Sequence, residues 1–290
     1  MQGWLLYSEA DADRNEQYIN WLKEEGQAQG MTISLLYRHK LTIGISHNKP
    51  TVMYENKPIA LPDFAIVRTI EPVIQQLFEA MDIPSFNSFS VADLTNHKSR
   101  TYIEMNKLGV PILSTFFTSK KELPAEPPLP YPFIIKEATG RGGSGVHYIN
   151  SEIEWHDSLS KIKSSDLVIQ DAHVKLGMDL RVFVIGKEII AAVLRKNDHD
   201  FRANYSLGGN AELYSLSDCE TKLVQKIVDH FSFDLVGIDF LIGHHDELIF
   251  NEIEDVVGSR ILSATTDINL LEKYMAYIKQ TLTETMLVQN

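Results

Sequence analysis

Short apolar runs alternate with amphipathic stretches along the first third of the chain. Residues 4–7 have the pattern of a buried strand, and residues 11–29 are typical of a polar helix with Tyr18, Ile19 and Leu22 on one face. Four further β-rich runs are separated by Asn, Lys and Pro turns, at 33–36, 41–45, 51–54 and 64–67. Apolar residues then recur at helical spacing over 73–81 and 91–108. This order predicts an N-terminal α/β unit.

The pattern changes at a proline-rich segment. Between residues 120 and 132 lie five prolines, at positions 124, 127, 128, 130 and 132. Proline lacks the amide hydrogen that a helix or a central strand requires. We therefore predict a stiff linker here and, with it, a boundary between subdomains.

The remainder of the chain predicts two further groups of strands. The first has strands at 133–137 and 146–149 around a glycine-rich loop at 140–145, a helix at 153–163 and a strand at 167–171. The second has strands at 180–185, 188–194, 211–216, 235–242 and 247–254, with helices at 217–230 and 270–287. Strands and helices alternate loosely, which predicts a mixed α/β fold in three parts.

Composition and charge narrow the class of protein. The 290 residues exceed what one compact core usually serves, and 44% of them are hydrophobic, so we expect a folded chain with several subdomains. The chain has 27 Lys and Arg against 39 Asp and Glu, and its net charge of −12 disfavours nucleic acid and anionic lipid as partners. A phosphate ligand would therefore require a few placed cations.

Two other features bear on localisation. Cys219 is the only cysteine, which excludes a disulfide within the chain and a multi-cysteine zinc site, and fits a reducing cytosol. The apolar run at the N-terminus is too short for a signal peptide, and no later run reaches the roughly 20 residues of a membrane span. We expect a cytoplasmic protein without a membrane partner.

The first candidate for chemistry is Lys136 with the loop that follows it, Gly140-Arg141-Gly142-Gly143-Ser144-Gly145. Glycines let backbone N–H groups approach phosphate oxygens, because no Cβ stands in the way. The loop is neither a Walker loop nor a dinucleotide fingerprint, since it lies between two strands. A flexible glycine-rich hairpin explains the same sequence.

The second candidate is a group of acidic residues on two predicted strands. Side chains alternate along a strand, so Glu252 and Glu254 point to the same face, and Asp239 lies on a neighbouring strand. Three facing carboxylates repel one another unless a cation lies between them, and hard oxygen ligands suit Mg²⁺ or Mn²⁺. The alternative is that these residues are solvated ends of strands in an acidic chain.

Three arginines form the third candidate. Arg181, Arg195 and Arg202 lie at or beside predicted strand ends. The rigid guanidinium fork suits a phosphate or carboxylate held in a fixed pose. Each arginine alone is better explained as half of a surface ion pair.

The order of these motifs resembles the ATP-grasp superfamily, and within it the branch of the ribosomal-protein glutamate ligase RimK. The motifs are Lys98 on a helix, Lys136, the glycine loop, Gln170-Asp171, Asp179-Leu180-Arg181, Arg195, Arg202-Ala203-Asn204 with Gly208-Gly209, Asp239 and Glu252-Ile253-Glu254. The resemblance spans about residues 75–254. It implies an α/β (α+β) ATP-grasp fold, with an N-terminal pre-ATP-grasp domain at 1–92 and an ATP-grasp domain at 93–290. Within the latter we expect a glycine-loop lid at about 121–175 and a metal-binding subdomain at about 176–290.

The resemblance also implies an activity and roles for single residues. The family joins a carboxylate to an amine through an acylphosphate and releases ADP, so small-molecule or peptide carboxylates and amines are the implied substrates. The implied ATP-binding residues are Lys98, Lys136, Gly142, Gly143, Ser144, Gly145, Gln170, Asp171, Ala172, His173 and Asp179. Asp239, Glu252 and Glu254 would hold Mg²⁺ or Mn²⁺, typically as two ions. Arg195, Arg202 and Asn204 would hold the transferring phosphoryl group or the acylphosphate.

Two departures from the family pattern leave alternatives open. The third metal position is usually Asn, whereas this chain has Glu254, and the turn that normally follows is replaced by residues 255–260. Ser259 and Arg260 are candidates to take over a carboxylate-binding role in that turn. A small-molecule kinase on the same scaffold, or an ATP-binding regulator without turnover, fits the remaining motifs. A homo-oligomer is compatible with the family.

Overall fold

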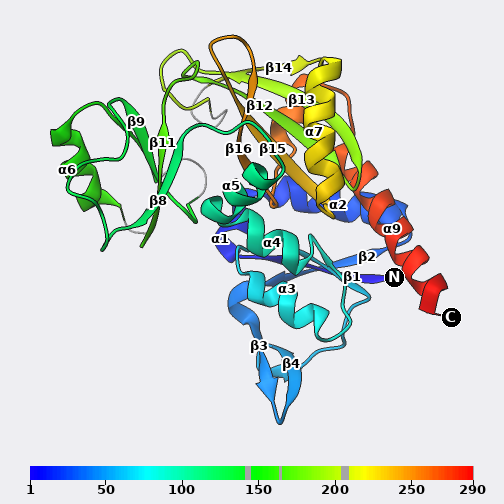
Figure 1. Ribbon diagram of the computed structural model, residues 1–290. Coiled ribbons are helices and arrows are strands. Elements are labelled where there is room, and N and C mark those ends of the chain that lie inside the picture. Colours follow the sequence, from blue (N-terminus) through cyan, green and yellow to red (C-terminus); the bar gives the residue numbers. More distant parts are fainter. Residues whose placement is uncertain (141–144, 163–164, 204–208, 290) are drawn as a thin grey trace.

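The computed structural model describes residues 1–140, 145–162, 165–203 and 209–289, and their strands form four sheets (Figure 1). The fold is mixed α/β, with one parallel sheet near the N-terminus and antiparallel sheets elsewhere. None of the helices in this described part combines the length and the apolar composition of a membrane span.

The N-terminal sheet is parallel and has the order β2-β1-β6-β7. Its strands are β1 (Gln2–Tyr7), β2 (Thr32–Tyr37), β6 (Phe64–Val67) and β7 (Ser85–Phe86). Helices α1 (Glu9–Arg14), α2 (Glu16–Ala28) and α3 (Pro72–Glu79) connect them. The single helix predicted at 11–29 is two helices, because Asn15 leaves the helical conformation and its side chain donates to the carbonyl oxygen of Asp11 at 2.7 Å.

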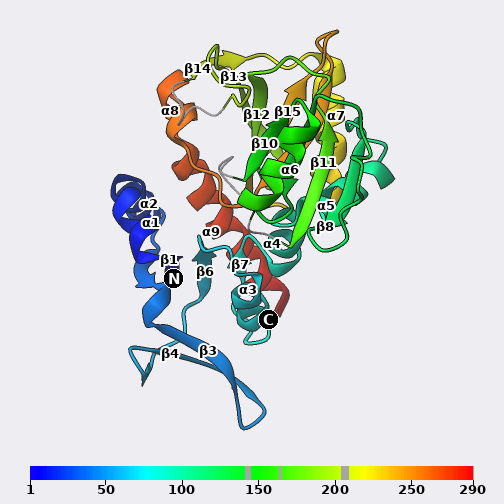
Figure 2. The same cartoon turned by 90° about the vertical axis from the view of Figure 1, so that its left-hand side faces the viewer.

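A small antiparallel sheet projects from the N-terminal sheet and forms the lower tip of the molecule in Figures 1 and 2. It consists of β3 (Leu41–Ser46), β4 (Lys49–Tyr54) and β5 (Lys57–Pro58), preceded by the short 3-10 helix η1 (Arg38–Lys40). His47 and Asn48 both have positive φ angles, which gives the tight hairpin turn between β3 and β4 the twist that adjacent strands prefer.

A four-stranded antiparallel sheet, the lid sheet, has the order β10-β9-β11-β8. Its strands are β8 (Thr115–Ser119), β9 (Phe133–Glu137), β10 (Val146–Ile149) and β11 (Asp166–Asp171), and α6 (Glu152–Lys161) packs on it through the buried Trp155. The linker prediction for 120–132 is wrong, because β8 lies before this segment and pairs with β11. The prolines therefore lie in a connection between two strands of one sheet.

The central sheet is antiparallel and has the order β14-β13-β12-β15-β16. Its strands are β12 (Met178–Ile185), β13 (Glu188–Lys196), β14 (Asn210–Tyr214), β15 (Leu235–Ile242) and β16 (Leu248–Glu254). The associated helices are α4 (Phe89–Thr95), α5 (Lys98–Lys107), α7 (Asp218–His230), α8 (Arg260–Thr265) and α9 (Leu270–Gln289).

The two faces of the central sheet belong to different cores. Val182 and Val184 pack with residues of α5 and α7, whereas Phe183, one position away, packs with α9 and with the N-terminal sheet. This division follows from the alternation of side chains along a strand. The N-terminal sheet and the central sheet thus share one apolar cluster, joined by α9. The division of the chain at residue 92 stays a prediction.

Candidate active site

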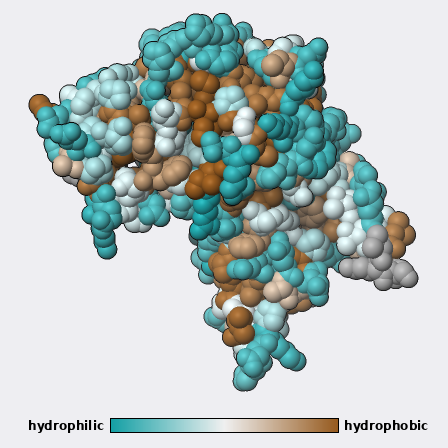
Figure 3. Space-filling view, in the orientation of Figure 1, coloured by the Kyte–Doolittle hydropathy of each residue, from teal (hydrophilic) through white to brown (hydrophobic). Residues whose placement is uncertain are grey.

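A cleft open to solvent lies between the lid sheet and the central sheet, and its empty space, open solvent included, is about 900 Å³. In Figure 3, apolar surface gathers on the face where the lid meets the rest of the molecule. The apolar lining of the cleft includes Ile134 from the lid and Leu176, Met178 and Leu241 from the central sheet and its approach. Its polar lining comes from α5, β9, β11, β12, β16 and the segments between them: Lys98, Lys136, Glu137, Gln170, Asp171, Lys175, Asp179, Arg202, Asn251 and Glu252.

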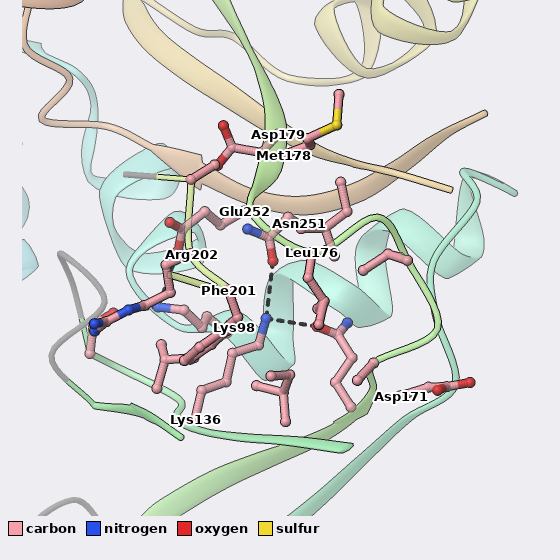
Figure 4. Close-up of a pocket in the computed structure, with 18 of the residues that line it drawn as sticks. Lys98, Lys136, Asp171, Leu176, Met178, Asp179, Phe201, Arg202, Asn251 and Glu252 are labelled. Carbon is pink, nitrogen blue, oxygen red and sulfur yellow. Dashed lines mark hydrogen bonds and ion pairs between the residues drawn. The ribbon is translucent and has the colours of Figure 1, made fainter. Parts of the chain in front are cut away.

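Lys136 is buried on one wall of this cleft. It lies on β9 between Val146 and Val168 of the neighbouring strands. Its Nζ donates to the Tyr102 hydroxyl at 2.7 Å, to Gln170 Oε1 at 2.9 Å and to Asn251 Oδ1 at 3.1 Å, the last two drawn in Figure 4.

Among the described residues, the three hydrogen-bond partners of Lys136 are neutral groups. Burial lowers the pKa of Lys136 to about 8, although the charge of Glu252 opposes this shift. A buried ammonium without a carboxylate in hydrogen-bond contact attracts an anion from solvent, because the low dielectric of the site screens its charge poorly.

Lys98 is the first residue of α5 and connects the acidic residues to the glycine loop. Its Nζ lies 3.3 Å from Glu252 Oε2 and donates to the carbonyl oxygen of Gly140, at the start of the loop. Tyr102 follows four residues later, on the same face of the helix. One turn of α5 therefore supplies both a cation at the cleft and a hydrogen-bond partner for Lys136.

The three carboxylates meet where the middle of β15 faces the last residues of β16. Asp239, Glu252 and Glu254 each offer an oxygen, and these oxygens lie within 4.8 Å of one another. Asp239 pairs in register with Glu252, and Gly237 with Glu254, so both glutamates point to the side of Asp239. The donor set consists of hard oxygens and fits Mg²⁺ or Mn²⁺. That an ion binds there stays a prediction.

Two buried arginines hold this cluster from behind. Arg181 donates to both oxygens of Asp239, at 2.7 and 2.6 Å, and its Nη1 lies 2.9 Å from Glu254 Oε2. Arg195 donates from Nη2 to Asp179 Oδ2 at 2.7 Å and to Asp239 Oδ2 at 2.9 Å. The arginines therefore share Asp239 between them.

The two aspartates of this network have opposite pKa shifts. Burial alone would raise the pKa of Asp239, but the charges of Arg181 and Arg195 outweigh it and hold that pKa below its usual range. Burial raises the pKa of Asp179 to about 6, although Arg195 opposes the shift. Asp239 is thus the carboxylate that stays ionised throughout the physiological pH range.

The structure brings most of the predicted site residues to the cleft. The predicted residues that line it are Lys98, Lys136, Gly145, Gln170, Asp171, Ala172, Asp179, Arg202 and Glu252. Arg202 donates from Nη2 to Asp200 Oδ2 at 2.7 Å, at the edge of the site.

Other predicted residues lie elsewhere. Arg195, Asp239 and Glu254 lie behind the lining, in the network described above. His173 does not line the cleft: it is exposed, with its ring against His244. Gly142, Gly143, Ser144 and Asn204 lie outside the described residues.

Sequence reasoning missed Asn251 as a site residue. Strict alternation would place it on the face opposite Glu252. The register instead shifts between Asp239 and Phe240, where Asp239 pairs with Glu252 but Phe240 pairs with Phe250, so Asn251 is the extra residue of a bulge. Both Asn251 and Glu252 consequently line the cleft. Tyr102 and the apolar residues Leu176 and Met178 were missed as well, and for Tyr102 the helical spacing from Lys98 was an available signal.

Comparison with known proteins identifies the family. A model of the RimK-like ATP-grasp domain matches residues 95–278. A probable alpha-L-glutamate ligase of Pasteurella multocida is 25% identical over 283 residues, which cover 89% of each chain.

Solved structures agree in fold. A RimK domain ATP-grasp protein of Sphaerobacter thermophilus has a TM-score of 0.73 at 16% identity, covering 98% of this chain and 100% of that chain. The ATP-grasp ligase PsnB, solved with a minimal precursor, Mg and ADP, has a TM-score of 0.68 at 15% identity, covering 96% of this chain and 97% of that chain. The chain therefore belongs to the RimK-like ATP-grasp family and is an ADP-forming carboxylate–amine ligase of that family.

Proposed function

We propose that this ligase binds Mg·ATP in the cleft and joins an amino-acid or peptide carboxylate to an amine through an acylphosphate. The observation that carries the proposal is the convergence of Asp239, Glu252 and Glu254 beside a cleft whose walls hold Lys98 and Lys136. Carboxylates that hold a divalent ion and lysines that face the same cleft are the groups that bind a Mg-bound polyphosphate.

The base and the phosphates of ATP would occupy different ends of the cleft. Ile134, Leu176, Met178 and Leu241 supply apolar walls for a planar base, and the backbone at 170–172 lies within reach of its edge. Lys98 and Lys136 would contact the phosphates. Binding of an anion supplies the missing partner of the Lys136 ammonium and so raises its pKa from about 8.

Asp239, Glu252 and Glu254 would hold Mg²⁺, and two ions or Mn²⁺ are also compatible with this donor set. Bound there, the metal supplies charge stabilisation at the phosphates. Arg181 keeps Asp239 and Glu254 in place and offsets part of their charge. The ion pair with Arg181 thereby accommodates the negative charge of Glu254 at a position where the family usually has a neutral amide.

The chemistry requires no protein nucleophile. A substrate carboxylate oxygen attacks the γ-phosphorus of ATP and ADP leaves; the amine nitrogen then attacks the acyl carbon and inorganic phosphate leaves. Fixed positive charges stabilise the charge that develops on the transferring group. Lys98 and Lys136 are placed for this role, and Arg202 joins them if it exchanges Asp200 for the acylphosphate.

The substrate class that we propose is inferred from the names of related proteins. The Pasteurella relative is named for glutamate, and PsnB was solved with a peptide precursor. We infer that the substrates of this chain are amino acids or peptides and that it has no nucleic-acid or membrane partner. We also infer a cytosolic location, where ATP and Mg²⁺ are abundant, and a homo-oligomer, which is compatible with the family.

The test is product analysis with Mg·ATP and pools of amino acids and short peptides. Release of ADP and inorganic phosphate together with an amide product is expected. AMP with pyrophosphate would contradict the proposal, a stable phosphorylated product would indicate a kinase, and a thermal shift with ATP but no ADP would indicate a regulator.

Glu252→Gln should abolish turnover and weaken the effect of Mg²⁺ on the melting temperature, with Glu24→Gln, an exposed residue of α2, as the control. The fold should persist, because the change relieves carboxylate repulsion. Normal turnover in the Glu252 variant would show the metal assignment to be wrong.

A further inference from the structure

Two histidine side chains lie against each other outside the cleft, on segments that are distant in the sequence. His173 follows β11, and His244 lies in the turn between β15 and β16. Their ring centres are 4.5 Å apart, and the ring planes are inclined by 69° to each other. Both residues are exposed, so ions in solvent have access to the imidazoles.

Backbone and ion-pair contacts hold the two segments together. The amide of His173 donates to Asp171 Oδ1 at 3.0 Å, which fixes the turn that carries its ring. The amide of Lys175 donates to the carbonyl oxygen of Ile242 at 2.8 Å, and the Lys175 ammonium pairs with Asp246 in the turn between β15 and β16. The two imidazoles are therefore close together before a ligand binds, which lowers the entropic cost of sharing one.

The separation of the rings matches two imidazoles that bind one metal ion at right angles. A metal ion lies about 2.1 Å from the imidazole nitrogen that binds it, and hence about 3.2 Å from the ring centre. Two such rings at right angles have centres about 4.5 Å apart, and two at the tetrahedral angle about 5.2 Å. The observed distance is the first of these. Right angles are typical of the square-planar and tetragonal sites of Ni²⁺ and Cu²⁺, whereas Zn²⁺ prefers tetrahedral sites.

The surroundings of the two rings also suit a cation of this kind. The carboxylate of Glu247 lies in the same turn as His244 and accepts from the amide of His245 at 2.9 Å. No third His, Cys, Asp or Glu within the described ranges completes a group of three ligands with the two imidazoles, so water would fill the remaining positions. Imidazole ligands select a transition metal over Mg²⁺, because Mg²⁺ prefers oxygen. This pair and the acidic cluster of the cleft therefore suit different ions.

We propose that His173 and His244 form a second metal site, which binds Ni²⁺ or Cu²⁺ and clamps the connection between the lid sheet and the central sheet. The chain leaves the lid sheet at Asp171 and enters the central sheet with β12. Ala172 and Val174 of this connection line the cleft, whereas His173 does not. An ion that joins His173 to the turn between β15 and β16 restrains a segment that lines the cleft. Because lid motion accompanies substrate entry and product release, occupancy should slow turnover.

Calorimetry with NiCl₂ on the nucleotide-free chain, without an affinity tag, tests the site. Excess Mg²⁺ is present throughout, so that it competes with Ni²⁺ for oxygen ligands. We expect one Ni²⁺ per chain. His173→Gln and His244→Gln should each weaken it by at least about 10-fold, because removal of a ligand costs no less than removal of a group that supports one. His156→Gln, at an exposed position of α6, is the control and should leave the affinity unchanged.

Three results would overturn the metal site. Absence of Ni²⁺ binding, or equal affinity in the unmodified chain and both site variants, would leave the two rings as a stacked pair only. Equal weakening in His156→Gln would show that Ni²⁺ binds exposed histidines without selectivity.

Electron paramagnetic resonance of bound Cu²⁺ is an independent readout of the ligands. The unmodified chain should show coupling to two imidazole nitrogens, and His244→Gln to one. A signal from oxygen ligands alone in the unmodified chain would contradict the assignment.

The clamp is tested through ADP release, separately from metal binding. Free Ni²⁺, held by a metal buffer at a level that fills the site, should slow ADP release by the unmodified chain in excess Mg²⁺. His244→Gln should keep its basal rate and resist this inhibition. Equal inhibition of the variant would show that the ion acts elsewhere and would overturn the clamp. Calorimetry does not depend on turnover, so failure of the ligase mechanism and failure of the metal site are distinguishable.

Discussion

Asn87 connects three segments that are distant in the sequence, and its removal should be among the most costly single changes in the molecule. Its Nδ2 donates to the carbonyl oxygens of Leu235 and Asp255, at 2.8 and 2.9 Å. Its Oδ1 accepts from the amide groups of Asp234 and Leu235, at 2.8 and 3.2 Å. The side chain is only 4% exposed, so water cannot replace these partners.

The expected loss follows from this count. Asn87→Ala leaves two N–H and two C=O groups buried without partners, and each bond contributes about 1 kcal/mol, with unpaired buried groups costing more. We expect the free energy of unfolding to fall by about 3–4 kcal/mol. Leu235 begins β15 directly after Asp234, and Asp255 directly follows β16, so the variant should also disturb the strands that carry Asp239 and Glu252.

Urea unfolding followed by circular dichroism measures the loss, with the exposed Asn150→Ala as a control. Asn87→Asp provides an independent check, since it keeps an acceptor for the amides but presents an acidic oxygen to two carbonyl groups. At neutral pH it should be as damaging as the alanine variant, and it should regain stability as the pH falls and the carboxyl gains a proton. A loss below about 1 kcal/mol in Asn87→Ala would refute the reasoning, because four buried bonds cannot then be contributing.

Three further changes have expected outcomes. Lys136→Met should lower ATP affinity roughly 10- to 100-fold in calorimetry. The nucleotide-free protein should stay at least as stable, because a buried ammonium without a charged partner is lost. Lys121→Met is the control, and equal weakening of ATP binding in that variant would count against the role of Lys136. Gly177→Ala should destabilise the fold by about 2 kcal/mol or more, since φ is +71° and the new Cβ would lie 2.2 Å from a backbone oxygen. Gly44→Ala is the control, because a Cβ there meets no neighbouring atom. Equal urea midpoints for the two variants would contradict this prediction. Burial raises the pKa of Asp234 to about 7, although a hydrogen bond from Tyr277 opposes the shift. As the pH rises, Asp234 loses its proton near pH 4 in the unfolded chain and only near pH 7 in the folded protein, so the free energy of unfolding falls by roughly 2–4 kcal/mol between these values. Asp234→Asn should lack this fall in urea titrations across pH. A pH profile equal to that of the unmodified protein would contradict the assignment.

Local patterns were sufficient for the elements that carry the site. Strands β9 and β10 occur at the residues predicted from their apolar runs, because the glycine loop marks the end of β9 and the start of β10. The convergence of Glu252 and Glu254 on Asp239 followed from the period of two along a strand. These features depend on residues near one another in the sequence, with one exception: that β15 and β16 are neighbours in the sheet is not a local property.

Features that depend on distant pairing were not accessible in the same way. The linker prediction for 120–132 was wrong because it did not include the pairing of β8 with β11, about 50 residues later in the chain, as the register of Thr115 with Gln170 shows. Asn251 was missed because a bulge reverses the face of one residue, and only the partner strand reveals it.

The acidic cluster and the cations around it are balanced in charge, although the whole chain carries −12. Within the described residues, the acidic cluster and the cations around it contain four carboxylates and four cations: Asp179, Asp239, Glu252 and Glu254, and Lys98, Lys136, Arg181 and Arg195. The charges are separated in space, with the arginines behind the carboxylates and the lysines toward the cleft. A nucleotide with its divalent ions brings the complementary arrangement, since its cations face carboxylates and its phosphates face lysines. Acidity spread over the rest of the surface repels polyanions at long range but is screened beyond about 8–10 Å in physiological salt, so it does not oppose a single Mg·ATP inside this cleft.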